Sequence, residues 1–382
     1  MKILHIITRL ILGGAQENTV LSCEGQLRSG HAVTLAFGPI YGPEGSLLER
    51  AKRSGVSCVE LSAMQRAVRP LTDWRAYRQC RALIDRIGPD VVHTHSSKAG
   101  IVGRFAAWQA GVPAVVHTIH GLPFGPHAPW LANRLYRAAE RAAARRCHAI
   151  VTVADAMAEQ ALAAGVGRAG QFATIYSGME VDRFIQAPDD RTRTRGQLGI
   201  AGDDLVIGTV ARLAEHKGHD DLLDVLPALV ERHSNVRLLW VGDGWWRDRL
   251  TRRIERMGMT DRVIMTGLVA ADDVPRCLRA MDVLVHPSYR EGLPRTLPQA
   301  LLSGVPVVAY DRDGAPEACI DGRTGRLVAT GDRGQLLDAL AWMADHPAER
   351  QAMATAGRTM CVERFDAAVM VSQLEGLYRQ LL

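Results

Sequence analysis

Two cations stand in one loop that joins a predicted strand to a predicted helix. Arg212 directly follows the apolar segment 205–211, and Lys217 comes five residues later, before a helix expected to begin near His219. A guanidinium binds phosphate oxygens in pairs, an ammonium adds a compact positive charge, and a helix start favours anions. The loop therefore predicts a phosphate or diphosphate site, unless Glu215 pairs with one of the cations.

An acid and an amide follow a later apolar segment. Glu291 comes after the predicted strand 283–287, and Gln299 lies eight residues further on, in a helix whose first turn we place near Pro294. Backbone N–H groups before that turn can face an anion, while Glu291 and Gln299 can bind sugar or ribose hydroxyls. The ligand-binding positions predicted beside Glu291 are Gly292, Leu293, Pro294 and Gln299.

Glycines follow two other predicted strands. Gly13 and Gly14 precede a helix near Ala15, and Gly267 ends the segment 263–267. Such glycines let the backbone approach a ligand closely, although a tight turn explains the first pair equally well. GxGxxG and Walker A patterns are absent, so neither a dinucleotide site nor a P-loop is predicted.

Histidines mark a further strand end. His117 lies inside the segment 114–120, and His120 ends it, where an imidazole can bind a substrate hydroxyl or serve a structural role. His93 and His95 have the composition of a metal pair, but no cysteine or carboxylate accompanies them. We therefore predict no metal site.

Apolar segments alternate with helical patterns throughout the chain. This order, with nearly continuous apolar runs bounded by Gly, Pro or Asp, predicts α/β domains with doubly wound parallel sheets. The predicted strands are 3–7, 32–37, 90–95, 114–120 and 149–154, then 205–211, 236–242, 263–267, 283–287 and 305–310.

Two Rossmann-like domains with a cleft between them follow from this pattern. The first is expected over 1–185 and the second over 186–362, with a polar stretch near the boundary. A last helix over 363–382 is expected to pack back on the first domain.

Composition narrows the classes of function. Apolar content is 47%, and no apolar run is long enough to span a membrane. Seven scattered cysteines without a CxxC spacing predict reduced thiols and a cytoplasmic protein. Residues 1–180 hold 20 Lys and Arg against 12 Asp and Glu, whereas the remainder holds 26 against 29. This distribution suggests an anionic partner for the first half, and nothing predicts a nucleic-acid partner.

Together these residues resemble the family 4 glycosyltransferases, which have the GT-B fold. The resemblance covers almost the whole chain and rests on several short motifs. They are GGAQ (13–16), HTHSSKAG (93–100), HTIHG (117–121), YSGMEVDRF (176–184), ARLAEHKG (211–218), VGDG (241–244) and EGLPRTLPQALLSGVPVVA (291–309).

The resemblance implies roles for the candidate residues. Glu291 matches the first acid of the family's Glu–seven residues–Glu motif, while Gln299 replaces the second acid, which usually contacts the nucleotide ribose. Arg212 and Lys217 match cations that hold the donor diphosphate. His120 matches an active-site histidine near the donor sugar, and Gly13 and Gly14 match a loop beside the diphosphate.

The implied reaction is the transfer of a sugar from a UDP- or GDP-sugar to an acceptor hydroxyl, with retention of anomeric configuration. The nucleotide sugar is a substrate, and no cofactor or metal is expected. A nucleotide-sugar 2-epimerase of similar fold, or a non-catalytic binding protein related to these enzymes, is the alternative.

Arginines on two predicted helices suggest where the acceptor binds. Those of the first segment are Arg134, Arg137, Arg141 and Arg145, and those of the second are Arg66, Arg69, Arg75, Arg78, Arg81 and Arg86. They predict peripheral docking on an anionic inner membrane face, with a lipid-linked or cell-surface glycan as acceptor. Ordinary solvated or internally paired arginines explain the pattern as well.

Overall fold

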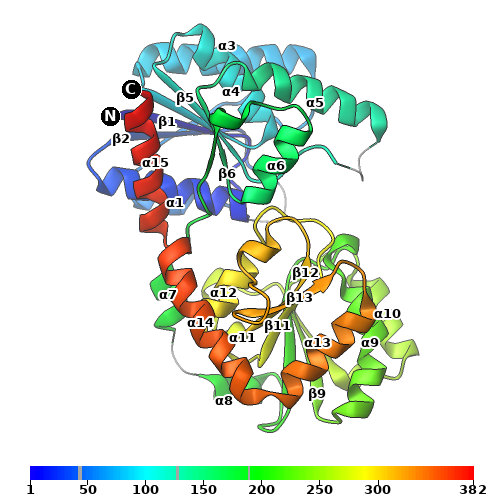
Figure 1. Cartoon of the computed structure of the whole chain (residues 1–382). Helices are drawn as coiled ribbons and strands as arrows, with labels where there is room; N and C mark the ends of the chain where they lie inside the picture. The colour runs from blue at the N-terminus through cyan, green and yellow to red at the C-terminus, as the bar shows by residue number, and fades with distance from the viewer. Residues whose placement is uncertain (42–44, 126–128, 188–189) are drawn as a thin grey trace. The chain divides into compact units, whose positions relative to one another are not determined.

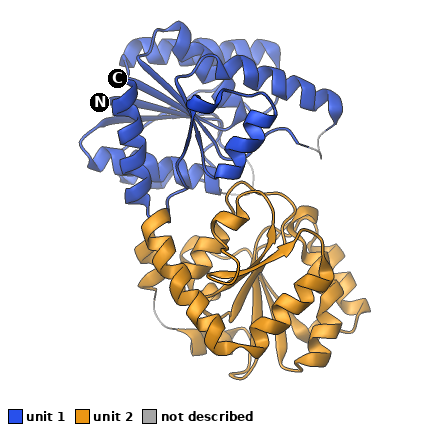
Figure 2. Ribbon diagram, in the orientation of Figure 1, with its two compact units in different colours: residues 1–179, 365–382 blue, residues 180–364 orange. Residues whose placement is uncertain are grey.

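The computed structural model describes residues 1–41, 45–125, 129–187 and 190–382. The chain divides into unit 1, residues 1–179 and 365–382, and unit 2, residues 180–364 (Figure 2). The structure divides the chain between residues 179 and 180, whereas the boundary expected from the sequence lay between 185 and 186. The short helix over 181–185 therefore belongs to unit 2. All seven cysteines are unpaired.

Unit 1 contains a seven-stranded parallel sheet in the order β3-β2-β1-β4-β5-β6-β7. The apolar strands at its centre are buried along most of their length, which matches their continuous hydrophobic sequences. The strands are β1 (Lys2–Ile7), β2 (Ala32–Phe37), β3 (Ser57–Glu60), β4 (Val91–His95), β5 (Ala114–Ile119), β6 (Ala149–Thr152) and β7 (Phe172–Thr174).

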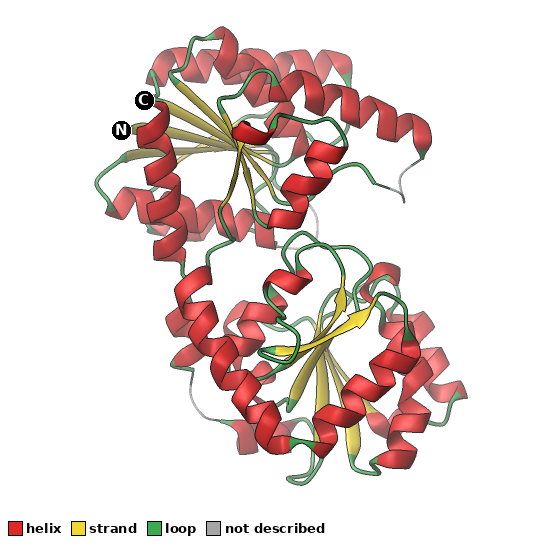
Figure 3. Cartoon of the chain, in the orientation of Figure 1, coloured by secondary structure: helices red, strands yellow, loops and turns green. Residues whose placement is uncertain are grey.

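Helices cover both faces of this sheet, so the predicted doubly wound fold is confirmed. Helices α3, α4 and α5 lie on one face, and α1 with the C-terminal α15 lies on the other (Figures 1 and 3). The helices of unit 1 are α1 (Gly14–Arg28), α2 (Leu48–Arg53), α3 (Pro70–Ile87), α4 (Ser97–Gln109), α5 (Trp130–Ala144), α6 (Asp155–Ala163) and α15 (Ala367–Leu381), with a 3₁₀ turn at Ala169–Gln171.

The expected single helix over 363–382 is wrong in one respect. Helix α14 (Pro347–Phe365) ends at Phe365, and α15 begins after Asp366, whose carboxylate accepts a hydrogen bond from the Ala368 N–H at 2.7 Å. An aspartate cap starts a new helix at this point because it satisfies an N–H group without a partner inside the helix. Helix α15 then buries Leu374 and Tyr378 in the core of unit 1.

Unit 2 repeats the plan with a six-stranded parallel sheet in the order β10-β9-β8-β11-β12-β13. Its strands are β8 (Leu205–Val210), β9 (Val236–Val241), β10 (Val263–Gly267), β11 (Val283–His286), β12 (Val307–Asp311) and β13 (Gly325–Ala329). Its helices are α7 (Val181–Ile185), α8 (Arg191–Gln197), α9 (His219–Arg232), α10 (Arg247–Arg256), α11 (Val274–Arg279), α12 (Thr296–Leu302), α13 (Arg333–Asp345) and α14, with 3₁₀ turns at Glu215–Lys217, Thr260–Arg262, Ala271–Asp273 and Ala315–Glu317.

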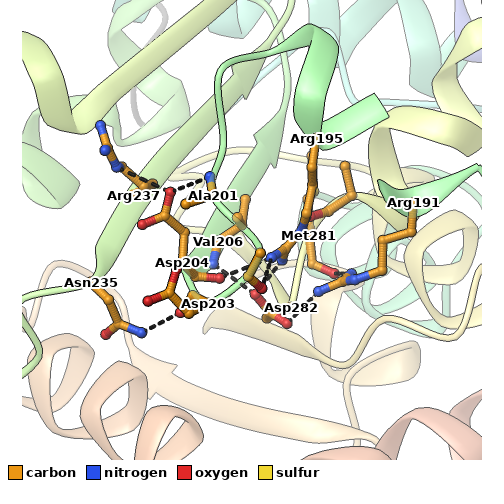
Figure 4. A network of polar contacts seen from close by, with 12 residues as sticks. Arg191, Arg195, Ala201, Asp203, Asp204, Val206, Asn235, Arg237, Met281 and Asp282 are labelled. Atoms are coloured by element: carbon orange, nitrogen blue, oxygen red, sulfur yellow. Dashed lines mark hydrogen bonds and ion pairs between the residues drawn. The ribbon is translucent and has the colours of Figure 1, made fainter. Parts of the chain in front are cut away.

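A charged network ties α8 to the amino ends of the central strands of unit 2 (Figure 4). Asp282, directly before β11, accepts hydrogen bonds from Arg191 at 2.6 Å and Arg195 at 2.7 Å. The backbone N–H of Val206 in β8 donates to the same carboxylate at 2.7 Å. This network holds β8 beside β11 at the end of the sheet opposite the loops that follow these strands.

Candidate active site

Lys217 and Glu291 lie in the loops that follow the two neighbouring strands β8 and β11. The strand order reverses between these strands, and the crevice at such a point is where doubly wound sheets bind ligands. The ammonium of Lys217 contacts Oε1 of Glu291, and both side chains are largely buried. The structure thus joins two residues that the sequence analysis placed in separate loops.

Two hydrogen bonds and one close backbone contact hold the two loops together. His216 presents its carbonyl to the N–H of Tyr289 at 2.8 Å and to the hydroxyl of Ser288 at 3.0 Å. Gly218 has a φ of 72°, and a side chain there would clash with the carbonyl of Pro287. Only glycine satisfies both the left-handed backbone and the close approach, so the sequence Lys-Gly at 217–218 fixes the position of Lys217.

His286 and Lys217 both meet the carboxylate of Glu291, and Asp313 binds its backbone. Nε2 of His286 lies 2.9 Å from Oε1 of Glu291. The backbone N–H of Glu291 donates to a carboxylate oxygen of Asp313 at 2.7 Å. Burial by itself raises the pKa of Glu291, but the hydrogen bonds and positive charges of His286 and Lys217 outweigh burial and hold this pKa well below its usual range. Glu291 is therefore an anion at neutral pH, suited to binding hydroxyls and to opposing positive charge on a sugar ring.

His286 was missed by sequence reasoning. It is the last residue of β11, it is buried, and its Nδ1 lies 3.3 Å from the hydroxyl of Thr296 at the start of α12. Its place at a strand end, five residues before Glu291, was a signal that could have identified it.

Arg212 takes a different position from Lys217. It is exposed, with its guanidinium 5.6 Å from the centre of the Trp245 ring, and within the described chain it makes no contact with the Lys217–Glu291 pair. Glu215 was the alternative partner for one of these cations. In the structure Lys217 pairs with Glu291 instead.

The segment after Glu291 is bent before it becomes helical. Helix α12 begins at Thr296, two residues after the position near which its first turn was expected. The N–H of Leu297 bonds the carbonyl of Pro294 at 3.1 Å in a tighter turn that precedes the regular helix. The N–H groups of Gly292 and Leu293, and the side chain of Gln299, have no hydrogen-bond partner among the described residues. These groups are available to a ligand.

The glycine candidates differ in what the fold requires of them. Gly267 has a φ of 72°, and its carbonyl accepts hydrogen bonds from Gly242 and Thr266, so backbone geometry explains it. Gly13, by contrast, has extended backbone that any residue adopts, and α1 begins directly after it at Gly14. The fold therefore gives no backbone reason for glycine at position 13.

His120 lies at the carboxyl end of β5 in unit 1, where it lines a pocket of about 230 Å³. Its Nε2 is 3.1 Å from Nδ1 of His95. Other residues of the pocket include His117, Phe124 and Glu140, whose carboxylate forms a buried ion pair with Arg104 at 2.5 Å.

Ser96 also lines this pocket and was missed. Its φ of 62° and ψ of 158° place it in a region normally reserved for glycine, at a cost of about 1–3 kcal/mol. Its hydroxyl lies 2.7 Å from that of Thr8, which follows β1, so it connects the loops at the point where the strand order of unit 1 reverses. Only the structure could reveal this backbone conformation.

Three buried imidazoles, those of His5, His93 and His95, lie close enough together to share a metal ion. Their ring nitrogens are instead engaged in hydrogen bonds with one another or with Gln26, Tyr378, Thr118 and His120. The geometry is that of a hydrogen-bonded network.

Both units match known glycosyltransferase domains. A model described as "Glycosyl transferases group 1" matches residues 190–360, and one described as "Glycosyl transferase 4-like domain" matches residues 13–178. The 2-deoxystreptamine glucosyltransferase of Streptomyces kanamyceticus is 30% identical over 300 residues, which are 76% of this chain and 77% of that protein. This chain belongs to glycosyltransferase family 4.

Other members of the family are similar over more of the chain. The GDP-mannose-dependent alpha-(1-6)-phosphatidylinositol monomannoside mannosyltransferase of Mycolicibacterium smegmatis is 28% identical over 348 residues, covering 89% of this chain and 88% of that protein. Among solved structures, Anabaena HepE in complex with UDP superposes with a TM-score of 0.85 and 23% identity over the whole of both chains. The likeness in structure confirms the GT-B fold for this glycosyltransferase.

Proposed function

We propose that this glycosyltransferase moves a sugar from a UDP- or GDP-sugar to an acceptor hydroxyl with retention of anomeric configuration. The observation that carries the proposal is the buried contact of Lys217 with Glu291, supported by His286, in the loops after β8 and β11. In this proposal Lys217 is the cation that stabilises the leaving diphosphate, and Glu291 beside it is the carboxylate that faces the sugar.

The chemistry follows from these charges. As the bond to the sugar breaks, the diphosphate gains negative charge, which Lys217 and the exposed Arg212 stabilise without a resident metal. The sugar becomes oxocarbenium-like, and the Glu291 carboxylate stabilises it electrostatically. Attack on the same face, assisted by the departing phosphate oxygen, gives retention. Activity that is unchanged by EDTA supports this assignment of charge, and activity that requires a divalent cation contradicts it.

The donor sugar is expected to be carried by either UDP or GDP. The mycolicibacterial relative is named for GDP-mannose, while UDP-sugars are the other donors expected from the family resemblance. Gln299 replaces an acid that usually contacts the ribose, and its amide offers both an acceptor and donors. A Gln299→Glu variant shows whether the amide selects between the two nucleotides.

We further propose a lipid-linked or cell-surface glycan as acceptor, bound by unit 1. Large apolar side chains are exposed on α5, at Trp130, Leu131 and Leu135, and Leu71 and Trp74 are exposed on α3. Arginines are interspersed with them, a composition suited to the surface of an anionic membrane.

Several of these arginines also have internal partners: Arg141 donates to the carbonyl of Ala164, and Arg81 pairs with Asp85. Among the described residues, no helix is both long and apolar enough to cross a membrane.

Purified protein mixed with UDP- and GDP-sugars and candidate acceptors tests the function. Released nucleotide together with glycosylated product supports transfer. A donor that is isomerised without an acceptor supports an epimerase, and binding without turnover supports a non-catalytic protein.

Vesicle co-sedimentation tests the membrane contact separately. The Leu131→Ser, Leu135→Ser double variant should lose binding to vesicles rich in anionic lipid. The matched control is Leu268→Ser, which alters a leucine of unit 2 that is 78% exposed. Binding that is insensitive to the anionic lipid content contradicts the docking proposal.

A further inference from the structure

A chain of hydrogen bonds runs from the pocket of unit 1 into its core. Nε2 of His120 lies 3.1 Å from Nδ1 of His95, and Nε2 of His95 lies 2.9 Å from Nδ1 of His5. Nε2 of His5 in turn lies 2.8 Å from Oε1 of Gln26 on α1. The three imidazoles follow or belong to β5, β4 and β1, which are neighbours in the sheet.

The direction of every hydrogen bond follows from the amide at the inner end. The Gln26 oxygen only accepts, so His5 carries its proton on Nε2, and a neutral imidazole then accepts at Nδ1. His95 must donate to that atom from its own Nε2, which leaves its Nδ1 to accept. The remaining donor is Nε2–H of His120. In its neutral form His120 therefore has its lone pair on Nδ1.

A second branch begins at the nitrogen of the same amide. Nε2 of Gln26 donates to the hydroxyl of Tyr378 on α15 at 3.4 Å, and this hydroxyl lies 2.5 Å from Nδ1 of His93. His93 completes the branch with its Nε2 at 2.6 Å from the hydroxyl of Thr118. Were the amide reversed, each ring in both branches would carry its proton on the other nitrogen. Gln26 thus governs both branches.

The inner rings remain neutral. Burial lowers the pKa of His5 to about 4, and burial together with the neighbouring histidines lowers the pKa values of His93 and His95 well below 6.5. The amide of Gln26 cannot store a proton. The chain therefore fixes a tautomer and does not carry a proton away from the pocket.

We propose that Gln26, His5 and His95 are positioning residues that hold His120 as the Nε2–H tautomer, so that its Nδ1 accepts a hydrogen bond from a sugar hydroxyl. The substrate part of this inference rests on the proposed function. The tautomer itself does not, because it follows from contacts within unit 1.

Nuclear magnetic resonance of protein with ¹⁵N-labelled histidine rings tests the tautomers directly. His5, His93, His95 and His120 should show the Nε2–H pattern at pH 7. His117 is the internal reference for the opposite pattern, since its Nδ1 lies 3.1 Å from the carbonyl of Thr94, which only accepts. The His120 signals are identified by their loss in His120→Asn. An Nδ1–H pattern for His120 in the wild-type protein overturns the proposal, whether or not any variant folds.

The Gln26→Glu variant tests control from a distance. A carboxylate at this position favours a protonated His5, which then donates from both nitrogens, so His95 and His120 should both change to the Nδ1–H form. Gln79→Glu, a half-buried amide of α3 bonded to Ser62, is the matched control and should leave these rings unchanged. Thermal unfolding checks that both variants are folded. A folded Gln26→Glu protein in which His5 is doubly protonated while His95 and His120 keep the Nε2–H form contradicts the proposal.

Kinetics then separate positioning from simple structural support. An imidazole in the wrong tautomer lowers kcat by about 10⁴ in a serine protease, so we expect at least a tenfold loss of kcat in Gln26→Glu, with the donor KM within twofold. Unchanged kcat in a protein with inverted tautomers overturns the catalytic part. If the wild-type protein transfers no sugar but its rings show the expected pattern, the proposed function fails and the tautomer assignment stands.

Discussion

Nε2 of His286 lies 2.9 Å from Oε1 of Glu291, the oxygen that Lys217 also contacts. Two residues that carry or can carry positive charge therefore meet one carboxylate in the crevice of unit 2. A carboxylate held in this way stays ionised, which excludes it as a proton donor to the leaving group and favours an electrostatic role. A bound diphosphate would compete with Glu291 for Lys217.

Replacing His286 tests its support of Glu291. A hydrogen bond to a charged group contributes about 1.5–3 kcal/mol, so His286→Leu should lower kcat roughly 10- to 100-fold. His286→Gln, which can still donate to the carboxylate, should recover part of the loss. Steady-state kinetics provide the comparison, and a folded Leu variant with wild-type kcat would show that His286 is dispensable.

Lys217 and Glu291 should behave as one unit. Lys217→Ala and Glu291→Ala are each expected to lose about 100-fold or more of kcat/KM, because each removes charge that opposes charge developing in the reaction. The double variant should be scarcely worse than the poorer single variant. Lys52→Ala, which removes a lysine exposed on α2, is the control. Full activity in both single variants, with the fold intact, would refute the assigned site.

Acid should destabilise unit 1 through His5. Its pKa is lowered by burial from 6.5 to about 4, so between these values the unfolded chain binds a proton that the folded chain does not. Stability is therefore complete above pH 6.5 and falls as the pH approaches 4, by about 3 kcal/mol from this residue. Hydrogen exchange of β1 amides at pH 7 and pH 5 measures the loss.

The His5→Asn variant should reduce this dependence on pH, since asparagine keeps an acceptor towards His95 but does not titrate in this range. His346→Asn, which alters a histidine of unit 2, serves for comparison. An equally steep loss of protection in His5→Asn would assign the acid sensitivity to other groups.

The Asp282 network should contribute strongly to the stability of unit 2. Asp282→Asn weakens the interactions with Arg191 and Arg195, of which Arg195 is buried, and should cost about 3–5 kcal/mol. Asp338→Asn removes an exposed ion pair with Arg232 and should cost less than about 1 kcal/mol. Urea unfolding of the two variants provides the test, and equal losses would contradict the importance given to burial.

Most of the central strands could be predicted because they are continuous apolar runs. The expected strands 32–37 and 263–267 have the same bounds as β2 and β10, and α9 begins at His219 as expected. The edge strands β3, β7 and β13 were missed. They are short and only partly buried, so their sequences lack the apolar run that marks a central strand.

The site was less accessible to sequence reasoning, because its geometry depends on contacts between distant segments. Lys217 meets Glu291 only because Gly218 packs against the backbone of Pro287. The spacing of Arg212 and Lys217 indicates a shared anionic ligand, but it does not reveal that Arg212 extends over Trp245 or that Lys217 contacts Glu291. His93 and His95 were not assigned a role from the sequence, because their hydrogen-bond partners His5, Tyr378 and His120 lie on other segments of the chain.

Helix α15 completes unit 1 with the last residues of the chain, including Tyr378, whose hydroxyl reaches His93. During synthesis on the ribosome, the whole of the continuous segment 180–364 is polymerised before these residues are added. The nascent unit 1 therefore lacks part of its core until the segment that separates its two parts has been made. The first unit to be translated is the last to be completed, and chains released before α15 is made would expose the apolar surface of α1 that this helix covers.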